Sequence, residues 1–414
     1  LAVTFGPLRP NIFRVSFLLN LPLADPINGV IFYSILAIAA IIILLQRKVW
    51  PLIIAALLCI IAWFLLRHWQ VPWYIFLAAF VPVAALVRKP KIVTVTAGIF
   101  SLLATVGIVN MEYQTYPDIA SLDPRPVAKE MSYEEFSHTK SGAAIVHVDL
   151  PGTTSHFAAR QATAYIPPAY WTDHTLPVIV LVHGNPGGPD QWFGSGEAAE
   201  TADQFQAANG GRSPIVIAVD ATGSETANPI CADSSQAKVM TYLSQDVPQA
   251  IKQKFKVNPD QRTWTVGGLS YGGTCSLQIA TNRPEAYGSI IDISGEAEPT
   301  IGNHAATVKK FFAGDESAFN DQDPAHLLAH KHFSTQAIFI AGDKDTASVN
   351  ALRSLSDAAR AAGMKTYFGT RPGGHSFQVW RPALRESFAW AASRGGMTAI
   401  KDPFDGIGAH DVRS

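Results

Sequence analysis

Four long apolar runs follow one another in the first quarter of the chain. None contains a charged residue, and each approaches the ~20 residues that a helix needs to cross ~30 Å of hydrocarbon. Tryptophans cluster near the ends of the runs, as they do at a membrane interface. Buried hairpins of a soluble core are the alternative, but runs this long and charge-free favour four transmembrane helices over residues 27–110, after an N-terminal segment of residues 1–26. The runs are Ile27–Leu45, Val49–Leu66, Val71–Val87 and Ile92–Val109.

Basic residues between these runs indicate how the spans are oriented. Cytoplasmic connections of membrane proteins are enriched in lysine and arginine. The first and third connections hold five such residues, against three in the N-terminal segment and the second connection. We therefore expect both termini to lie outside the cytoplasm. The five residues are Arg47, Lys48, Arg88, Lys89 and Lys91, and the three are Arg9, Arg14 and Arg67.

The spans themselves carry no ionisable residue, which predicts a membrane anchor rather than an ion or proton path. No signal peptide with a cleavage site follows Leu1, so we expect the spans to direct export. The sequence therefore predicts a multi-pass protein of the cell membrane whose large C-terminal domain is extracytoplasmic.

Beyond the spans, short apolar runs alternate with amphipathic segments. A proline-rich polar stretch over residues 111–140 is expected to be a juxtamembrane linker. Buried strands that alternate with helices indicate a mostly parallel sheet with helices on both faces. We expect this domain over residues 141–396, followed by a tail of residues 397–414. The predicted strands are Ala143–Val148, Ala162–Ile166, Val178–Val182, Ile215–Val219, Thr263–Val266, Ser289–Ile293, Ala337–Ala341 and Thr366–Phe368, and the predicted helices are Ser235–Phe255, Thr274–Asn282, Ser348–Ala362 and Pro382–Ser393.

The most informative stretch is Thr263–Ser276, which reads TWTVGGLSYGGTCS. Its first residues fit a buried strand, and the residues after the glycines fit a helix. G-x-S-x-G between a strand and a helix is the pattern of a nucleophile elbow. A serine at so sharp a turn has a strained backbone, and Gly268 and Gly272 remove side chains that would clash there. Ser270 is therefore the predicted nucleophile; the alternative is a glycine-rich turn with an incidental serine.

Eight strands with the elbow after the fifth match the α/β-hydrolase arrangement, in which an acid and then a histidine follow the nucleophile along the chain. His375 lies in the loop after the eighth strand, where this order places the base. After the seventh strand, Asp345 fits the acid in a G-x-x-D turn, with Asp343 as the alternative acid. Asp292 and Glu296 after the sixth strand fit less well. Four other histidines fit worse than His375 because they precede the acid in the sequence: His304, His326, His330 and His332.

An elbow serine that attacks a carbonyl generates an oxyanion, which backbone N–H groups stabilise. In this arrangement one N–H follows the nucleophile and another lies in the loop after the third strand. Tyr271 follows Ser270, and the loop after the third strand reads HGNPGG from His183. Because Pro186 has no N–H, Asn185 is the expected donor beside Tyr271. A flexible turn without a catalytic role is the alternative interpretation of HGNPGG.

Together these motifs resemble the esterase D type of serine esterase, a group that also includes bacterial mycolyltransferases. The resemblance rests on HGNPGG, on DVPQAI before the elbow, on GLSYGG, on the late aspartate and on GGHSF-x-x-W. It covers roughly residues 140–395. The spans lie outside it, and membrane-anchored versions resemble proteins of actinobacterial envelopes. Members of this family use no metal or organic cofactor, so the resemblance implies none here.

Charge and cysteine content restrict the other classes of function. The formal net charge of −1 gives no electrostatic reason to expect a nucleic-acid partner. No C-x-x-C pair or His/Cys cluster has the spacing of metal ligands. In this fold Cys231, after the fourth strand, lies near Cys275 at the start of the elbow helix. An extracytoplasmic location permits a disulfide between them; two unpaired core residues are the alternative, and Cys59 lies within a span.

The sequence thus predicts a membrane-anchored serine esterase that cleaves carboxylic esters through an acyl-enzyme. Lipid esters, including aminoacyl-lipid esters, suit a domain tethered near the bilayer, although tethering also suits soluble esters. Residues 297–335 are the expected specificity element. Acyl transfer to a sugar or lipid is the alternative, and a non-catalytic scaffold is a remote one because Ser270, Asp345 and His375 are all present. No pattern in the sequence indicates an oligomeric state.

Overall fold

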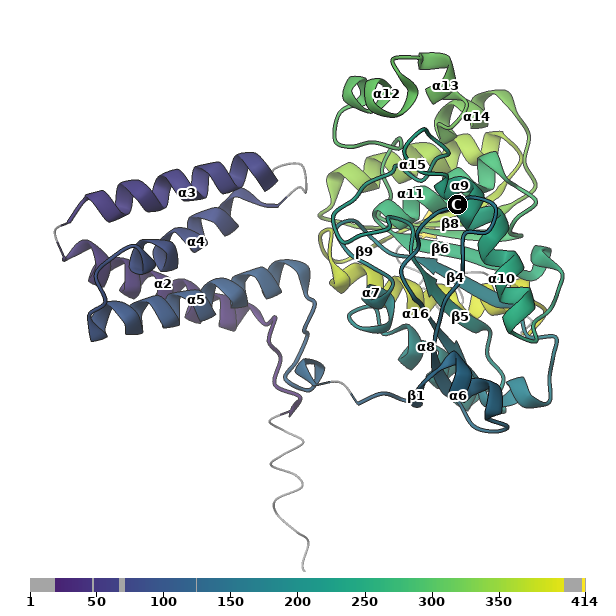
Figure 1. Cartoon of the computed structure of the whole chain (residues 1–414), viewed down its shortest axis with the longest axis horizontal. Coiled ribbons are helices and arrows are strands. Elements are labelled where there is room, and N and C mark those ends of the chain that lie inside the picture. Colours follow the sequence, from purple (N-terminus) through teal and green to yellow (C-terminus); the bar gives the residue numbers. More distant parts are fainter. Residues whose placement is uncertain (1–18, 47, 67–70, 124, 398–411, 414) are drawn as a thin grey trace, which may run out of the picture. The chain divides into compact units, whose positions relative to one another are not determined.

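The computed structural model describes residues 19–46, 48–66, 71–123, 125–397 and 412–413. The chain divides into two compact units, Leu1–Arg125 and Pro126–Ser414, whose elements are labelled in Figure 1. Most of the predicted N-terminal segment and C-terminal tail lies outside the described residues, as do Arg47 and Arg67. The boundary between the units falls inside the stretch that we expected to be a linker.

In its described residues, the N-terminal unit contains four apolar helices. α5 packs against α2 and α4, and α3 packs against α4. Small side chains allow this close packing, since Ala84 and Ala104 are buried in the core of the unit. A hydrogen bond of 3.1 Å from Thr105 Oγ1 to Ala78 O joins α5 to α4. The helices are α2 Pro26–Leu44, α3 Trp50–Leu66, α4 Trp73–Leu86 and α5 Ile92–Tyr113.

The length of these helices bears on the prediction of four spans. α2 and α5 are long and apolar enough to cross a membrane. α3 and α4 have 17 and 14 residues, and a helix of 14 residues is only about 21 Å long. The length therefore supports two of the four predicted spans, while the four-span region stays a prediction. α5 also continues past the predicted end of its span, and in that extension Glu112 accepts a hydrogen bond from Tyr74 Oη.

A ten-stranded sheet forms the centre of the second unit. Its strand order is β1-β2-β3-β5-β4-β6-β7-β8-β9-β10. The six strands from β5 to β9 in this order run parallel, whereas β3 is antiparallel to both β2 and β5. β1 joins one edge in parallel and β10 the other edge in antiparallel orientation. The strands are β1 Lys129–Ser132, β2 Ala144–Val148, β3 Ala162–Ile166, β4 Val178–Val182, β5 Ile215–Val219, β6 Thr265–Leu269, β7 Ser289–Ile293, β8 Gln336–Gly342, β9 Lys365–Arg371 and β10 Val412–Arg413.

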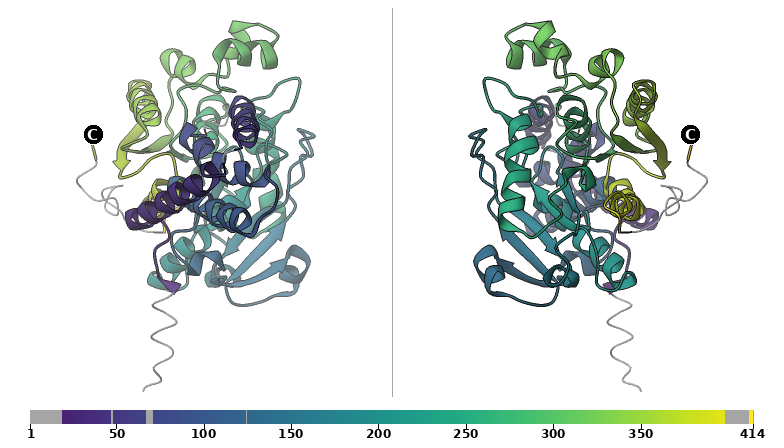
Figure 2. Two further views of the ribbon diagram at one scale, coloured as in Figure 1. Left: turned by 90° about the vertical axis from the view of Figure 1, so that its left-hand side faces the viewer. Right: turned by 90° about the vertical axis from the view of Figure 1, so that its right-hand side faces the viewer.

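Helices cover both faces of this sheet (Figures 1 and 2). α10, α11 and α15 contribute to the core on one face, and α8 and α16 to the core on the other. Because both faces are covered, the central strands are continuous apolar runs, and every residue of β4 and β5 is buried. The segment α12 to α14, between β7 and β8, lies at the top of the second unit, where it is labelled in Figure 1 and drawn in green in Figure 2. The helices are α6 Tyr133–His138, α7 Asp190–Phe193, α8 Ala198–Ala208, α9 Val239–Thr241, α10 Val247–Lys254, α11 Tyr271–Asn282, α12 His304–Phe312, α13 Glu316–Asn320, α14 Pro324–His330, α15 Thr346–Ala361 and α16 Phe377–Arg394.

The eight predicted strands form as β2 to β9, but the predicted linker over residues 111–140 is shorter in the structure. Its second half forms β1 and α6, and Met131 and Phe136 from these elements are buried in the core. These two elements were not predicted, because two isolated apolar residues among polar neighbours form no periodic hydrophobic pattern. The single helix predicted over Ser235–Phe255 is also divided, since a π-helical turn at Tyr242–Asp246 separates α9 from α10.

The strand order creates a switch point at β4. β5 lies on one side of β4 and β6 on the other, so the connections that leave the carboxyl ends of β4 and β6 run in opposite directions along the sheet. The register pairs Val182, the last residue of β4, with Gly268 of β6. The HGNPGG loop and the G-x-S-x-G turn therefore begin side by side.

A disulfide joins Cys231 to Cys275, as the sequence predicted, with a Cα–Cα distance of 5.5 Å and a sequence separation of 44 residues. The Tyr271 hydroxyl adds a second link, because it accepts a hydrogen bond from Cys231 N at 2.9 Å and donates to Ala221 O at 3.1 Å. The loop after β5 is therefore fixed to the start of α11.

We expect this disulfide to stabilise the second unit, because closing a loop of this length contributes about 4 kcal/mol in the chain-entropy account. The denatured protein should contain one reactive thiol, Cys59, without reductant and three with it. A double variant, Cys231→Ser and Cys275→Ser, should unfold at a lower temperature than the wild type, whereas Cys59→Ser should not. Three reactive thiols before reduction would contradict the disulfide.

Candidate active site

Ser270 stands at the turn between β6 and α11 in a conformation that side chains rarely adopt. Its φ is 52° and its ψ is −120°, and a non-glycine residue at such a position stores backbone strain. The turn is held in place because Ser270 N donates a hydrogen bond of 2.8 Å to Ile293 O at the end of β7. This is the geometry that the G-x-S-x-G pattern predicted.

The glycines around Ser270 are required by close backbone contacts. A Cβ atom on Gly272 would lie 2.1 Å from Val182 O of β4, and one on Gly268 would lie 2.3 Å from the Gly272 carbonyl carbon. Neither contact is possible, and in both cases the obstacle is backbone, which cannot move aside. The start of α11 therefore packs directly on the end of β4, and Ser270 is placed at the carboxyl edge of the sheet.

Three of the predicted site residues meet at this edge. Ser270 Oγ lies 2.9 Å from His375 Nε2, and His375 Nδ1 lies 2.6 Å from Asp345 Oδ2. They come from the turn after β6, the loop after β9 and the loop after β8. The imidazole packs edge-on against Trp380 with a distance of 5.1 Å between the ring centroids. The His375 side chain is 35% exposed. The histidine is thus oriented by its neighbours and remains open to a substrate.

Asp345 is held in its ionised form. Burial opposes ionisation, but the hydrogen bond and charge of His375 and the bonds from Ser348 outweigh it, so the pKa of the Asp345 carboxyl lies below its ordinary value. Asp345 is also the N-cap of α15 and accepts a hydrogen bond from Ser348 N at 3.2 Å. An ionised carboxylate can only accept hydrogen bonds, so the proton of neutral His375 lies on Nδ1 and Nε2 faces Ser270 as an acceptor.

The alternative acid and the other candidate histidines lie elsewhere. Asp343 is exposed, and its Oδ1 accepts a hydrogen bond of 2.9 Å from Gly373 N. It therefore stabilises the turn that carries His375 without touching the imidazole. His304 contacts Glu298 and Glu316, and the rings of His326 and His330 stack on each other. Among the described residues, Asp345 is the carboxylate that is hydrogen-bonded to His375.

The two predicted oxyanion donors lie in the segments that follow β4 and β6, which are neighbouring strands. In the described part of the chain, neither Asn185 N nor Tyr271 N has a hydrogen-bond partner, so both groups are available to a ligand. The side chain of Asn185 is engaged elsewhere, because its Nδ2 donates a hydrogen bond of 2.7 Å to Ala227 O. Gly184 N is occupied by Gln191 Oε1 at 3.0 Å. Asn185 N, the donor expected from the sequence, is therefore without a partner among the described residues, whereas Gly184 N is not.

Two further carboxyl groups lie near the site: Asp292 in β7 is fully buried, and Glu296 just after β7 is partly buried. Burial raises the pKa of Glu296 to about 7, against an opposing effect of the nearby His375, and raises the pKa of Asp292 to about 8. Asp292 Oδ1 accepts from Gly295 N at 3.0 Å, but its Oδ2 has no partner among the described residues. Neither carboxyl contacts the imidazole, so both are unsuited to the role of the triad acid.

Sequence reasoning missed a cluster of buried charges beside the HGNPGG loop. Arg160, His183 and Asp220 lie together there. The signal was present, because His183 and Asp220 directly follow β4 and β5 at the same carboxyl edge as Ser270. Among the described residues, no group of three or more His, Cys, Asp or Glu side chains is placed to hold a metal ion.

A mostly parallel sheet with a strained serine after β6 and a histidine and an aspartate after β9 and β8 defines an α/β-hydrolase. The chain belongs to the family described as Putative esterase, whose sequence profile matches residues 158–391. An uncharacterized protein of Corynebacterium glutamicum is 50% identical over 353 residues, which cover 79% of this chain and 83% of that protein.

Two solved structures share the fold at low sequence identity. A ferulic acid esterase is 17% identical with a TM-score of 0.52, and the similarity covers 62% of this chain and 100% of that chain. An S-formylglutathione hydrolase from Agrobacterium tumefaciens is 17% identical with a TM-score of 0.51, covering 62% of this chain and 96% of that one. These two similarities show the fold, and the family match supports an enzyme that acts on esters.

The burial of Glu296 makes a specific prediction about stability and pH. A carboxyl whose pKa is raised in the folded state stabilises the fold at low pH, and this contribution is lost as the pH rises from the ordinary value of 4.5 to about 7. The variant Glu296→Gln cannot ionise. Its thermal unfolding midpoint should therefore be close to that of the wild type at low pH and higher by several degrees at pH about 8.

The exposed Glu285 provides the matched control, because Glu285→Gln should not change the pH dependence of unfolding. A difference between Glu296→Gln and the wild type that is the same at both pH values would contradict the account of Glu296.

Proposed function

We propose that the protein is a serine esterase that cleaves carboxylic esters through an acyl-enzyme. The observation that carries this proposal is the continuous set of short contacts from Asp345 Oδ2 to His375 Nδ1 and from His375 Nε2 to Ser270 Oγ. A serine hydroxyl is a weak nucleophile unless an adjacent base takes its proton. The arrangement supplies that base and a carboxylate that orients it.

The reaction that fits these contacts has two halves. Ser270 Oγ attacks the ester carbonyl as its proton moves to His375 Nε2, and the resulting imidazolium is stabilised by Asp345. His375 then gives the proton to the leaving alcohol, and the acyl group remains on Ser270. Water enters, His375 takes its proton, and attack on the acyl carbonyl releases the acid and restores the Ser270 hydroxyl.

The free amides of Asn185 and Tyr271 are proposed to bind the oxyanion in both halves. Removing one such donor reduces the rate by about 10²–10³ in enzymes where the loss has been measured. The pairing of Val182 with Gly268 supports this proposal, because the loop after β4 and the turn after β6, which carry the two amides, begin side by side.

The proposed setting is the outer face of a cell membrane. The apolar helices α2 and α5 support anchoring of the N-terminal unit, and the Cys231–Cys275 disulfide suits an oxidising compartment. A tethered enzyme meets lipid esters in the bilayer, and we propose these, including aminoacyl-lipid esters, as the substrate class. Transfer to a sugar or lipid alcohol would use the same acyl-enzyme, and product analysis with and without an acceptor alcohol separates it from hydrolysis.

The role of the triad is tested by kinetics with a p-nitrophenyl ester. We expect Ser270→Ala and His375→Ala to lose on the order of 10⁴-fold or more in kcat, and Asp345→Asn to lose a similar or smaller factor. Ser354→Ala, at an exposed position of α15, is the matched control and should keep full activity. Ser270→Ala with wild-type activity would reject the proposed nucleophile.

The membrane topology is tested with reporter fusions to alkaline phosphatase, which is active only after export. A fusion after Lys89, in the connection between α4 and α5, should be inactive. A fusion after Pro126, at the start of the second unit, should be active. The opposite pattern would place the catalytic unit in the cytoplasm and contradict the proposed location.

A further inference from the structure

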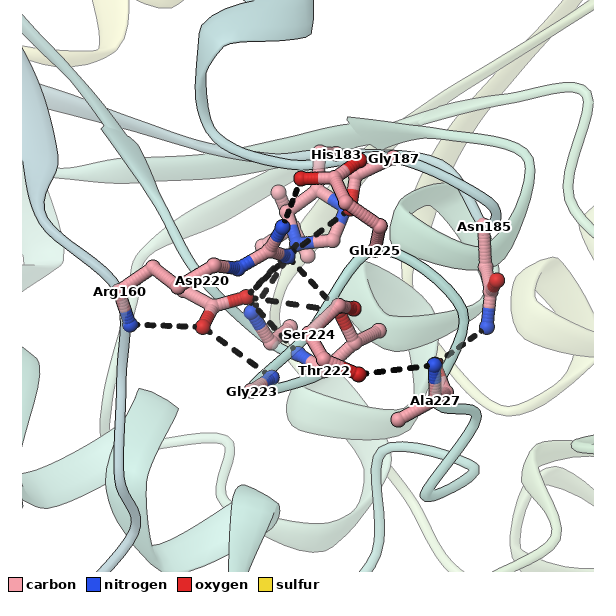
Figure 3. Close-up of polar contacts among 12 residues, drawn as sticks. Arg160, His183, Asn185, Gly187, Asp220, Thr222, Gly223, Ser224, Glu225 and Ala227 are labelled. Carbon is pink, nitrogen blue, oxygen red and sulfur yellow. Dashed lines mark hydrogen bonds and ion pairs between the residues drawn. The ribbon is translucent and has the colours of Figure 1, made fainter.

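A buried ionic network lies beside the loop that carries the proposed oxyanion donor (Figure 3). Arg160 lies two residues before β3, His183 directly after β4 and Asp220 directly after β5. His183 and Asp220 are fully buried, and the Arg160 side chain is 24% exposed. The proposed triad uses none of these side chains.

Arg160 lies at the centre of the network. Its Nη2 lies within hydrogen-bond distance of Asp220 Oδ1 at 2.8 Å, Gly187 O at 2.9 Å and Thr222 Oγ1 at 2.9 Å, which share its two N–H groups, while Nη1 pairs with Glu225. Figure 3 shows the guanidinium between the loop that holds Gly187 and the loop that follows Asp220. A planar fork of several donors is needed to serve all these acceptors at once, which lysine cannot provide.

Asp220 is kept ionised by its neighbours. Burial works against the charge, but hydrogen bonds from His183 and Arg160 outweigh it, and the pKa of the Asp220 carboxyl is far below its ordinary value. Its two oxygens also accept from the backbone N–H groups of Arg160, Thr222 and Gly223 at 2.8 to 3.1 Å. The carboxylate thus fixes the start of the loop after β5 and presents its charge to His183.

His183 connects Asp220 to the proposed oxyanion loop. One ring nitrogen, Nε2, lies 3.1 Å from Asp220 Oδ1 and 3.2 Å from Ala221 N. The other, Nδ1, lies 2.6 Å from Gly184 O. An oxygen of a carbonyl can only accept, so Nδ1 carries a proton and donates it to Gly184 O.

The contact with Gly184 O determines where the N–H of Asn185 points. The carbonyl of Gly184 and the N–H of Asn185 belong to one planar peptide unit, and in a trans peptide they point in opposite directions. Holding Gly184 O on the His183 side therefore directs Asn185 N–H to the other side of the loop. Arg160 holds the far end of the same loop through Gly187 O, and Gly187 N donates to Glu225 O at 3.0 Å.

We infer that Arg160 and Asp220 are positioning residues that, through His183 and Gly187, aim the backbone N–H of Asn185 at the oxyanion. Neither side chain touches the substrate, so the effect of changing them passes through the orientation of one peptide group. The inference rests on the proposed function, because it assigns a role in the same site. It differs from a purely structural role, in which the network would only join two loops and affect folding.

The test compares Arg160→Lys with Arg212→Lys in the full-length protein. Arg212 forms an exposed pair with Asp173 and should behave as the wild type when lysine replaces it. Hydrolysis of p-nitrophenyl acetate is measured after titration of active sites with a fluorophosphonate, so that misfolded protein does not enter kcat. Two inhibitors are compared: a trifluoromethyl ketone, which forms a tetrahedral oxyanion adduct with serine, and the matching methyl ketone, which resembles the ground state.

We expect Arg160→Lys to lower kcat by about 10-fold to 10²-fold, less than the loss of an oxyanion donor itself, with KM changed by less than about twofold. Affinity for the trifluoromethyl ketone should fall by the same factor as kcat/KM, while affinity for the methyl ketone should stay constant. If Arg160→Lys does not fold, Thr222→Val removes one hydrogen bond to the guanidinium and should lower kcat by about fivefold with the same pattern.

Three results would overturn the inference. A kcat per active site within about twofold of the wild type would show that the network does not reach the chemistry. A fall in kcat without a matching fall in affinity for the trifluoromethyl ketone would show that the change does not act on the oxyanion. Absence of both ester hydrolysis and fluorophosphonate reaction in the wild type would reject the proposed function and this inference with it.

Discussion

The close contact between the start of α11 and the end of β4 is the constraint on which the candidate site depends. The turn after β6 brings Gly272 so near to Val182 O that no side chain fits between them. This approach forces Ser270 into a positive φ at the carboxyl edge of the sheet. The strain is local, and it persists because β4, β6 and β7 surround the turn and because Ser270 N is bonded to Ile293 O. Every other group of the site is arranged around a serine whose position is fixed in this way.

Charge in the site follows one physical rule. Carboxylates with hydrogen-bond donors around them, Asp345 and Asp220, are held ionised despite their burial. Carboxyl groups that are buried with too few donors, Asp292 and Glu296, have raised pKa values. The two ionised carboxylates therefore suit the orienting roles that we propose: Asp345 orients His375, and Asp220 helps to orient the loop after β4. A fixed charge can orient a neighbour only if it persists at neutral pH.

Much of this site could be predicted from the sequence because its signals are local. The strand bounds around β4, β5 and β7 follow from short β-branched runs, and G-x-S-x-G and G-G-H follow directly from turn chemistry. The choice between Asp345 and Asp343 needed the structure, because the two residues are two positions apart and only the direction of the turn decides which one faces His375. Arg160 was missed for a similar reason. It lies before a strand rather than after one, and only the antiparallel pairing of β3 with β5 brings it to the site.

The C-terminal half of the predicted linker and the spans show the limits of composition. Charge-free runs predict helices well, and all four formed close to their expected bounds. Hydropathy does not determine the residue at which a helix ends. α4 is therefore shorter, and α5 longer, than the apolar run from which each was predicted. β1 and α6 were missed since each buries a single apolar side chain, Met131 and Phe136, which is too weak a signal against polar neighbours.

The role of Ser270 as the nucleophile is tested most directly by finding which residue becomes covalently modified. The protein is treated with a fluorophosphonate, digested with trypsin and analysed by tandem mass spectrometry. We expect one adduct, on Ser270 in the peptide that begins at Thr263, and no adduct in protein whose His375 has been replaced by alanine. Modification of a different residue, or no modification of the folded wild-type protein, would contradict this role.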